Sequence, residues 1–399
     1  MLLPKAPVAS DPMTRVLLVP DLPIERWPAM DRYASRLVHH MEGLTSDFEI
    51  AVATKIGRLT VDQPSTAQGE RKSAPRPLPL EPSFNPSQIR RFLARYWLYP
   101  RRVRRAPADV LHVLDHSYGH VLAARAGRPT VVTVHDLIPM MMLQRSAAGL
   151  RGRVRDWLLG RLLAGLREAD AWIVATDWLR SELAEWLGHD NGIRVIPYGV
   201  DDEFFLEPDQ DPQIIREANG IPPTAFVVLH VGSVGARKNV STVVAAVHGL
   251  RERGIEAWLL QVGGDLTAEQ RSDLEARNIQ KYTAVVGPTS EQDLRLAYRA
   301  ADVLLFPSHY EGVGLPVLEA MASGLPVVTS GAAGLTEVAG DAAVVVSGRE
   351  AEPYVSEVLR LAQDTAWHDD LVSRGQEQAS KYRWVEAARK TTEVYRSLV

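Results

Sequence analysis

Arg237 and Lys238 are adjacent basic residues in a glycine-containing turn. The turn spans residues 231–239, follows a predicted strand and precedes a helix expected to begin near Val240. Glycines such as Gly235 allow close approach of a ligand to the backbone, and a helix N-terminus favours an anion. Two side-chain cations there suit a diphosphate. A solvated basic pair in an ordinary strand–helix turn is equally consistent with this segment alone.

Two acidic residues, Glu311 and Glu319, lie eight positions apart in a second turn of this kind. The segment 306–328 predicts a strand end, a glycine turn at 312–314 and a helix starting around Leu315, with Pro316 in its tolerant first turn. Backbone N–H groups near the turn would face the same phosphate. One carboxylate can bond sugar hydroxyls while the other holds a ribose. The alternative is two plain surface charges.

The composition describes a globular protein of more than one domain. The chain has 399 residues, 46% of them hydrophobic, and no cysteine, which excludes disulfides, Cys-ligated zinc and a thiol nucleophile. No stretch approaches 18 apolar residues, and the first residues lack a secretion signal, so we expect a cytoplasmic chain that does not span a membrane. Residues 1–200 carry a net charge of +7 and the remainder −11, which suggests different partners for the two halves.

Short β-branched runs alternate with helical stretches along the whole chain. These runs are apolar on both faces, as expected of buried parallel strands, and they predict an α/β protein with two successive doubly wound domains. The predicted strands are Val16–Val19, Glu49–Thr54, Val110–Val113, Thr130–Val134, Ala171–Ala175, Arg194–Ile196, Val227–Val231, Ala257–Val262, Thr283–Val286, Val303–Phe306, Val327–Thr329 and Ala343–Val346.

Prolines and acidic residues mark a boundary between the two domains. We predict an N-terminal acceptor-side domain over 1–199, a linker over 200–222 and a C-terminal domain over 223–382. Residues 61–87, rich in Pro, Ser and Gln, predict a long loop. Parallel strands place ligand-binding loops at their carboxyl ends, so the loops of both domains should open toward one cleft.

Several motifs together resemble one enzyme family, the retaining glycosyltransferase family 4, which has the GT-B fold of two Rossmann-like domains facing across a cleft. The resemblance covers most of residues 130–399 and is strongest at 228–240 and 302–340. The motifs are Arg237–Asn239, Glu311–Glu319, Ile196–Asp201, Ala300–Asp302 and Glu337–Ala343.

The resemblance implies a role for each matching residue. Arg237 and Lys238 match the pair that binds the donor diphosphate, Glu311 the acid at the transferred sugar, and Glu319 the acid at the ribose. His135 matches a catalytic histidine beside the donor sugar, although a lone histidine after a strand is more often structural. Backbone contacts to sugar, phosphate or base are implied for Gly235, Val286, Gly287, Gly312, Val313, Gly314 and Leu315.

The resemblance also implies how the transfer proceeds. The sugar is transferred with retention by attack on the face that the diphosphate leaves, without a protein nucleophile. We expect no cofactor and no metal, because cations and a helix N-terminus supply the charge and no Asp-x-Asp pair stands in a suitable loop. In the family the last helix, here residues 383–399, crosses back to the first domain.

The acceptor side departs from the family pattern. Where many members carry a glycine-rich loop after the first strand, residues 20–33 contain no glycine. Trp27 or Arg32 replaces those contacts or simply packs. His116 and His120 follow another first-domain strand, where they line an acceptor cleft or serve the structure.

Residues 87–105 predict a basic amphipathic helix. Seven arginines and no acid fall between Arg90 and Arg105, and Ile89, Phe92, Leu93, Tyr96 and Trp97 share one face. Such a helix suits an anionic membrane surface and a lipid-linked acceptor. A core-packed helix with a solvated basic turn is the alternative. Nucleic acid is a poorer partner, because no base-reading module accompanies the charge.

The favoured reading is a hexosyltransferase with a saccharide or lipid-linked acceptor. The segment His135–Pro139 resembles mannosyltransferases of bacterial surface polysaccharides, which favours GDP-mannose as donor, with UDP-glucose and related donors open. The enzyme would work in the cytoplasm or at the inner face of the membrane. A non-catalytic nucleotide-sugar sensor or partner subunit is the alternative, and a GT-B epimerase fits the two-glutamate segment less well.

Overall fold

The computed structural model describes residues 13–22, 28–42, 44, 48–53, 86–144, 149–348 and 350–399. Residues 61–85 of the loop predicted over 61–87 lie outside these ranges, and so does Trp27. Among the helices in the described ranges, none has the length and apolar character needed to cross a membrane.

The first sheet has six strands in the order β2-β1-β3-β4-β5-β6. Strand β1 pairs in parallel with both β2 and β3, and Val19 lies beside Val113 in the register. Strands β3, β4 and β5 are buried along their whole length, as the absence of alternation predicted. The strands are β1 (Thr14–Val19), β2 (Phe48–Val52), β3 (Val110–Val113), β4 (Thr130–Val134), β5 (Ala171–Val174) and β6 (Ile193–Val195).

The second sheet also has six strands, in the order β12-β11-β10-β7-β8-β9, and all its pairs are parallel. The order runs outward in both directions from the centre, which is the doubly wound arrangement predicted from the sequence. The strands are β7 (Phe226–Gly232), β8 (Ala257–Gly263), β9 (Thr283–Val286), β10 (Val303–Phe306), β11 (Val327–Ser330) and β12 (Val344–Val346).

By contacts, the chain forms two compact units. Unit 1 comprises residues up to Val134, Ile138–Trp172 and Thr392–Val399, and unit 2 comprises His135–Leu137 and Ile173–Thr391. The predicted division at residues 199 and 223 stays a prediction. Helices that begin in unit 1 are α1 (Pro28–Glu42), α2 (Pro86–Leu93), the π-helical η1 (Ala94–Leu98), α3 (Tyr99–Arg105), the 3-10 helix η2 (His116–Ala124), α4 (Ile138–Gln144) and α5 (Gly149–Arg167).

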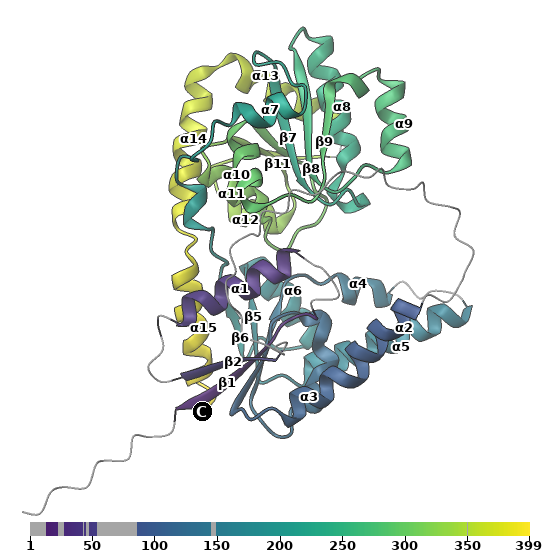
Figure 1. The fold of residues 1–399 in the computed structure, drawn as a ribbon, viewed down its shortest axis with the longest axis vertical. Helices are drawn as coiled ribbons and strands as arrows, with labels where there is room; N and C mark the ends of the chain where they lie inside the picture. The colour runs from purple at the N-terminus through teal and green to yellow at the C-terminus, as the bar shows by residue number, and fades with distance from the viewer. Residues whose placement is uncertain are drawn as a thin grey trace, which may run out of the picture. The chain divides into compact units, whose positions relative to one another are not determined.

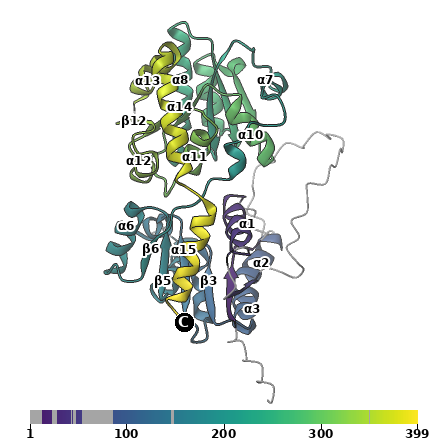
Figure 2. The same ribbon diagram turned by 90° about the vertical axis from the view of Figure 1, so that its left-hand side faces the viewer.

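Unit 2 surrounds the second sheet with helices on both faces (Figures 1 and 2). On one face, α8 and α13 cover a continuous core of valines and leucines from β7, β8, β10 and β11. The helices that begin in unit 2, of which α6 and α15 do not cover the second sheet, are α6 (Asp177–Leu187), η3 (Asp202–Phe204), α7 (Gln213–Ala218), η4 (Ala236–Lys238), α8 (Val240–Glu252), α9 (Ala268–Ala276), η5 (Gln280–Tyr282), α10 (Glu291–Arg299), α11 (Leu315–Ala322), α12 (Ala333–Ala339), α13 (Ala351–Gln363), α14 (Thr365–Ser380) and α15 (Trp384–Arg396).

Three aspartate carboxylates accept hydrogen bonds from backbone N–H groups at the N-terminal ends of strands. Asp109 accepts a hydrogen bond from the backbone N–H of Arg15 at 2.7 Å. Asp170 accepts from Thr130 N–H at 2.8 Å, and Asp302 from Val227 N–H at 2.7 Å. Each of these acids therefore satisfies a backbone donor that the sheet leaves unpaired.

Helix α15 is anchored at both ends. At its start the Trp384 ring stacks on Tyr198, with ring centroids 6.4 Å apart, and Gly199 packs so closely against Trp384 that a Cβ would lie 2.2 Å from its nitrogen. At its end the Tyr395 hydroxyl and His112 Nδ1 share a hydrogen bond of 2.6 Å (Figure 2 shows the helix). The last eight residues, Thr392–Val399, accordingly group with unit 1.

Candidate active site

The basic turn lies in unit 2 between β7 and α8. After Gly232 the chain makes one 3-10 turn, η4, and Asn239 adopts the left-handed conformation (φ 53°) before α8 begins at Val240, as predicted. Two hydrogen bonds join the turn to the segment after β10. The backbone N–H of His309 donates to the Arg237 carbonyl at 2.7 Å, and the side-chain amide of Asn239 donates to the Pro307 carbonyl at 3.3 Å. The two motifs found in the sequence therefore lie side by side.

Both cations of the turn meet a single carboxylate oxygen. Lys238 Nζ lies 2.6 Å from Glu311 Oε1, and Arg237 Nη1 lies 3.0 Å from the same atom. Lys238 and Glu311 are buried, with 6% and 8% of their surfaces exposed, whereas the Arg237 side chain is 40% exposed. Burial lowers the pKa of Lys238, and the Glu311 carboxylate opposes that shift. A buried Lys–Glu pair with one half-open cation is thus the electrostatic centre of this site.

The glycine turn after Glu311 is tightly packed in unit 2. A Cβ on Gly312 would lie 2.0 Å from the carbonyl oxygen of His135. Gly314 has φ +79°, which favours glycine, and a Cβ there would lie 2.3 Å from a methyl group of Leu335. Helix α11 then begins at Leu315, as predicted. Larger residues at either glycine would force the turn out of place.

Glu319 is inside the protein rather than on its surface. It is 3% exposed, and the Tyr298 hydroxyl donates to its Oε2 at 2.8 Å. With Glu311 also buried, the alternative of two plain surface charges is wrong for this segment. A buried carboxylate needs donors around it, because an unpaired one is expensive to desolvate.

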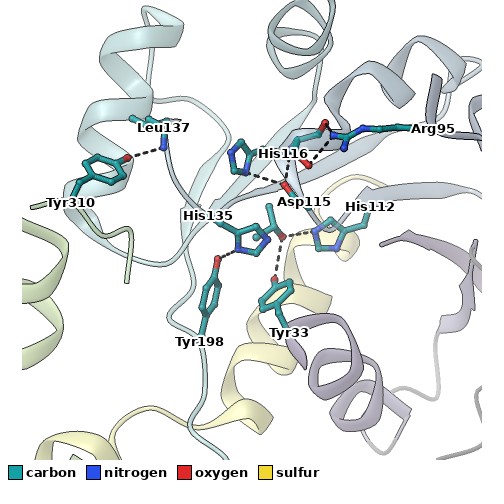
Figure 3. A network of polar contacts seen from close by, with 11 residues as sticks. Tyr33, Arg95, His112, Asp115, His116, His135, Leu137, Tyr198 and Tyr310 are labelled. Carbon is teal, nitrogen blue, oxygen red and sulfur yellow. Dashed lines mark hydrogen bonds and ion pairs between the residues drawn. The ribbon is translucent and has the colours of Figure 1, made fainter. Parts of the chain in front are cut away.

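His135 is held by a tyrosine that the sequence analysis did not single out. Its Nδ1 hydrogen-bonds the hydroxyl of Tyr198, and its ring meets that of Tyr198 edge to face (Figure 3). Two residues after His135, the backbone N–H of Leu137 donates a hydrogen bond to the hydroxyl of Tyr310 at 2.8 Å. Tyr310 directly precedes Glu311 in the chain. Residues 135–137 thereby join the Glu311 turn at two points, through Gly312 and through Tyr310.

Two buried polar residues close to the two motifs in the chain, His230 and Ser308, were missed as well. His230 on β7 hydrogen-bonds Gln261 at 2.7 Å and stacks on Phe306, whose ring lies 4.7 Å from Lys238 Nζ. Burial lowers the pKa of His230 to about 4, so the imidazole is neutral. His230 Nε2 and Ser308 Oγ have no hydrogen-bond partner among the described residues. Their positions in the sequence could have revealed both residues. His230 lies near the carboxyl end of the strand that precedes the basic turn, and Ser308 follows the strand that precedes Glu311.

The remaining predicted residues lie elsewhere. Val286 ends β9, which is separated from β7 by β8, and Gly287 follows it in an exposed position. In unit 1, His120 is buried and contacts the Arg95 carbonyl at 3.1 Å, and burial lowers its pKa to about 4. These contacts favour a structural His120. His116 is also buried, and Arg32, on α1, is partly buried.

No other feature of the described residues competes with this site. Within the described ranges, no group of three or more His, Asp or Glu is placed to hold a metal ion. A cavity of about 610 Å³ in unit 1 lies beside β1 and β2, and its lining, including Arg15, Glu49 and Arg102, contains none of the predicted site residues.

Comparisons with known proteins identify the family to which this chain belongs. The model of the family described as "Glycosyltransferase Family 4" matches residues 30–204, and that described as "Glycosyl transferases group 1" matches residues 211–379. The chain is a family 4 glycosyltransferase. The prediction from the sequence motifs is confirmed, and family membership makes the chain a retaining enzyme that uses a nucleotide-sugar donor.

Among the relatives of this glycosyltransferase is the O-antigen chain mannosyltransferase B of Escherichia coli, 27% identical over 313 residues that cover 75% of this chain and 78% of the relative. A D-inositol 3-phosphate glycosyltransferase of Nocardiopsis dassonvillei is 29% identical over 308 residues, covering 71% of this chain and 68% of the relative.

Solved structures identify the fold. Sucrose-phosphate synthase from Thermosynechococcus elongatus matches with a TM-score of 0.69 and 22% identity, covering 96% of this chain and 99% of that one. HepE of Anabaena, in complex with UDP-glucose, matches with a TM-score of 0.68 and 17% identity, covering 96% and 100%. The predicted GT-B fold is confirmed.

Proposed function

We propose that Arg237 and Lys238 bind the donor diphosphate, that Glu311 and His135 orient the transferred sugar, and that Glu319 binds the ribose. The observation that carries this proposal is the convergence of both cations on Glu311 within 3.0 Å in a largely buried site. A diphosphate would compete with the carboxylate for the two cations, and Glu311 would then be released toward sugar hydroxyls. The backbone of Gly235 and of residues 312–315 would complete the donor contacts.

We propose further that the reaction is a hexosyl transfer without a covalent enzyme intermediate. The bond between the anomeric carbon and the phosphate oxygen breaks, and a bond to the acceptor oxygen forms on the same face. The acceptor hydroxyl proton passes to the departing phosphate oxygen. Lys238 and Arg237 stabilise the charge that develops on the leaving group, in a site from which burial excludes water.

These two cations also support the proposal that no metal ion takes part. Activity that survives a chelator would agree with that role, and activity abolished by a chelator and restored by Mg²⁺ or Mn²⁺ would contradict it.

We place the donor base beside Val286 and Gly287, at the carboxyl end of β9. No Cβ contact lies within 4 Å of Gly287, so the backbone there is accessible to a ring.

For the donor we propose GDP-mannose. The similarity to the O-antigen chain mannosyltransferase B supports mannose, whereas HepE was solved with UDP-glucose. Thermal unfolding of the purified chain with GDP-mannose, GDP, UDP-glucose and UDP separates these donors. We expect the largest stabilisation with GDP-mannose and none for Lys238→Ala. Stabilisation by UDP-glucose alone would identify UDP-glucose, not GDP-mannose, as the donor. No change in melting temperature with any nucleotide sugar would refute the donor site.

We also propose that α2, η1 and α3 rest on an anionic membrane that carries a lipid-linked acceptor. Three side chains of the predicted apolar face, Phe92, Leu93 and Trp97, are each about half exposed, whereas Tyr96 is partly buried and packs on His120. Further along the segment, Tyr99 and Val103 are buried. Two other helices of unit 1 also expose apolar side chains, Met141 and Met142 on α4 and Val154 and Trp157 on α5. The exposed arginines on this segment are Arg90, Arg91, Arg101, Arg102, Arg104 and Arg105.

Flotation with phosphatidylglycerol vesicles tests this surface. We expect binding at low ionic strength that salt weakens, because the arginines act through a screened surface potential. Trp97→Ser should reduce binding, while Leu206→Ser, which removes an equally exposed apolar side chain from unit 2, should not. Absence of binding at low salt would end the proposal.

A further inference from the structure

Two buried polar residues face each other across the apolar strands β7 and β8. His230 and Gln261 are partners in the register of these strands, and both are 0% exposed. Buried parallel strands are normally apolar throughout, because an amide or an imidazole inside a sheet loses its water. An apolar pair would serve the fold at this position, so the polar pair calls for another role.

The hydrogen bonds of Gln261 fix the orientation of its amide. Its Nε2 lies 3.1 Å from the Gly232 carbonyl oxygen, 3.3 Å from that of Val262 and 3.4 Å from that of Gly264. Carbonyl oxygens only accept, so this atom is the amide nitrogen, and Oε1 faces His230 Nδ1 at 2.7 Å. His230 therefore donates through Nδ1 and holds the amide of Gln261 against the carboxyl ends of β7 and β8.

A second glutamine reaches the basic turn from helix α9. Gln270 Nε2 donates to the Val234 carbonyl at 2.9 Å, while its Oε1 accepts from Thr267 N–H at 2.9 Å in the capping box of α9. The Gly232 carbonyl, two residues before Val234, also accepts from Gly264 N–H at 2.9 Å. The segment from β8 to α9 thus holds two carbonyl groups at the start of the basic turn.

These bonds decide which way two N–H groups of the turn point. In a trans peptide the carbonyl of one residue and the N–H of the next point in opposite directions, and no described peptide bond is cis. The Gly232 carbonyl is turned toward β8, so the Ser233 N–H points away from β8. The Val234 carbonyl is turned toward α9, so the Gly235 N–H points away from α9. Ser233 and Gly235 are exposed, and neither N–H donates to another described residue.

Both outward N–H groups lie on the turn that carries Lys238. A Cβ on Gly232 would lie 3.7 Å from Lys238 Nζ, and the Gly235 carbonyl accepts from Lys238 N–H at 2.8 Å. In the proposed reaction Lys238 faces the phosphate next to the sugar, because charge develops there as the bond breaks. Backbone N–H groups bind phosphate oxygens through charge-assisted hydrogen bonds.

We propose that Gln261 and Gln270 are positioning residues for the donor, which turn the N–H groups of Ser233 and Gly235 toward the phosphate next to the sugar. His230 supports this role by fixing the amide of Gln261. Neither glutamine touches the donor in this arrangement, since each acts through a backbone carbonyl. The inference rests on the proposed donor site and adds the residues that shape it.

The variant Gln270→Glu tests this role without removing the cap of α9. A glutamate at this position keeps the capping box with Thr267, so the melting temperature should be retained, but it cannot donate to the Val234 carbonyl. Ala268→Glu, which is exposed in the same first turn of α9, is the control for the added charge. Isothermal titration of the full chain with GDP and UDP is compared with titration with GMP and UMP, which lack the phosphate next to the sugar.

We expect Gln270→Glu to weaken the diphosphate that the wild type binds by about tenfold relative to Ala268→Glu, as for the loss of a charge-assisted hydrogen bond. The affinity for the corresponding monophosphate should be equal in these two variants. A loss of stability alone would weaken both nucleotides alike, so the difference between them reports on the phosphate next to the sugar.

Two further variants complete the test. Gln261→Met should act in the same direction but less strongly, because Gly264 N–H still holds the Gly232 carbonyl. Gln378→Met removes a matching amide, which donates to the Val338 carbonyl on α12 at 2.9 Å, and should change neither affinity. If Gln270→Glu does not fold, the comparison of Gln261→Met with Gln378→Met decides in the same way.

Each result decides one of the two proposals. Equal diphosphate affinities for Gln270→Glu and Ala268→Glu, or a loss that is the same for monophosphate and diphosphate, would overturn the positioning role and leave the donor site standing. A wild-type chain that binds no diphosphate, or binds it no more tightly than the monophosphate, would overturn the proposed donor site itself.

Discussion

Replacing Lys238 by methionine separates the contribution of the buried ion pair to stability from the role that we propose for Lys238 at the donor diphosphate. In the wild type, Nζ lies 2.6 Å from Glu311 Oε1, and both side chains are more than nine-tenths buried. Removing one partner of a buried pair leaves a charge without compensation, at a cost of about 3–5 kcal/mol. Arg237 still contacts the same oxygen at 3.0 Å, so we expect a loss in unfolding free energy of about 3 kcal/mol, at the low end of that range.

The double variant Lys238→Met/Glu311→Gln supplies the contrast. It removes the buried charge together with its partner, so most of the lost stability should return. Turnover should not return, because the leaving diphosphate loses a cation worth about 10²–10³ in kcat, by analogy with the removal of one oxyanion-hole donor. Urea unfolding gives the stabilities, and chromatography of the released nucleoside diphosphate gives kcat.

Two outcomes would refute this reasoning. If Lys238→Met unfolds at the urea concentration of the wild type, Glu311 is not left uncompensated and the site is wetter than its burial indicates. If the double variant regains both stability and turnover, the pair serves the fold alone, and the donor diphosphate binds elsewhere.

Three further changes have outcomes set by single contacts. Gly312→Ala places a methyl group 2.0 Å from the His135 carbonyl oxygen, so it should destabilise the enzyme by more than about 1 kcal/mol and lower turnover. The control Gly160→Ala has open space around its methyl group and should change neither. Equal melting temperatures for the two variants would contradict the packing described here. Glu337 accepts from two N–H groups at the start of α6, at 2.6 and 2.8 Å, so Glu337→Ala should lower the unfolding free energy by about 1 kcal/mol, and an unchanged melting temperature would count against it. The folded-state pKa of His230 is about 4, below its ordinary 6.5, so the unfolded chain takes up the extra proton between these values and stability falls as pH drops through that window. His230→Gln should show a shallower fall in urea unfolding at pH 7 and pH 4.5, and equal slopes would contradict the assignment.

The fold was predictable because several central strands, such as β3, β4 and β10, are buried on both faces. Every predicted strand is present, and four have the predicted bounds, including β4 at Thr130–Val134 and β10 at Val303–Phe306. Periodicity alone does not separate such a run from a buried helix, so the short length of each run and its β-branched residues are what identify it as a strand. The starts of α8 and α11 were equally clear, because glycines and a proline mark them.

Contacts between distant segments were not predictable in the same way. Tyr198 was visible only as part of a family motif, and nothing in the sequence pairs its hydroxyl with His135, 63 positions earlier. The Tyr310 hydroxyl meets a backbone N–H 173 positions away. Tyrosine hydroxyls carry no periodic signal, so only the folded chain reveals their partners.

The ring of Trp178 stands edge-on to Tyr310, with centroids 5.5 Å apart, and Tyr310 directly precedes Glu311. An indole next to the turn that we propose binds the sugar is a fluorophore that the enzyme already carries. Movement of that turn changes the surroundings of this indole, so donor titrations can be followed by emission without a label. Comparison with Trp178→Phe assigns the signal to this one ring among the nine tryptophans of the chain.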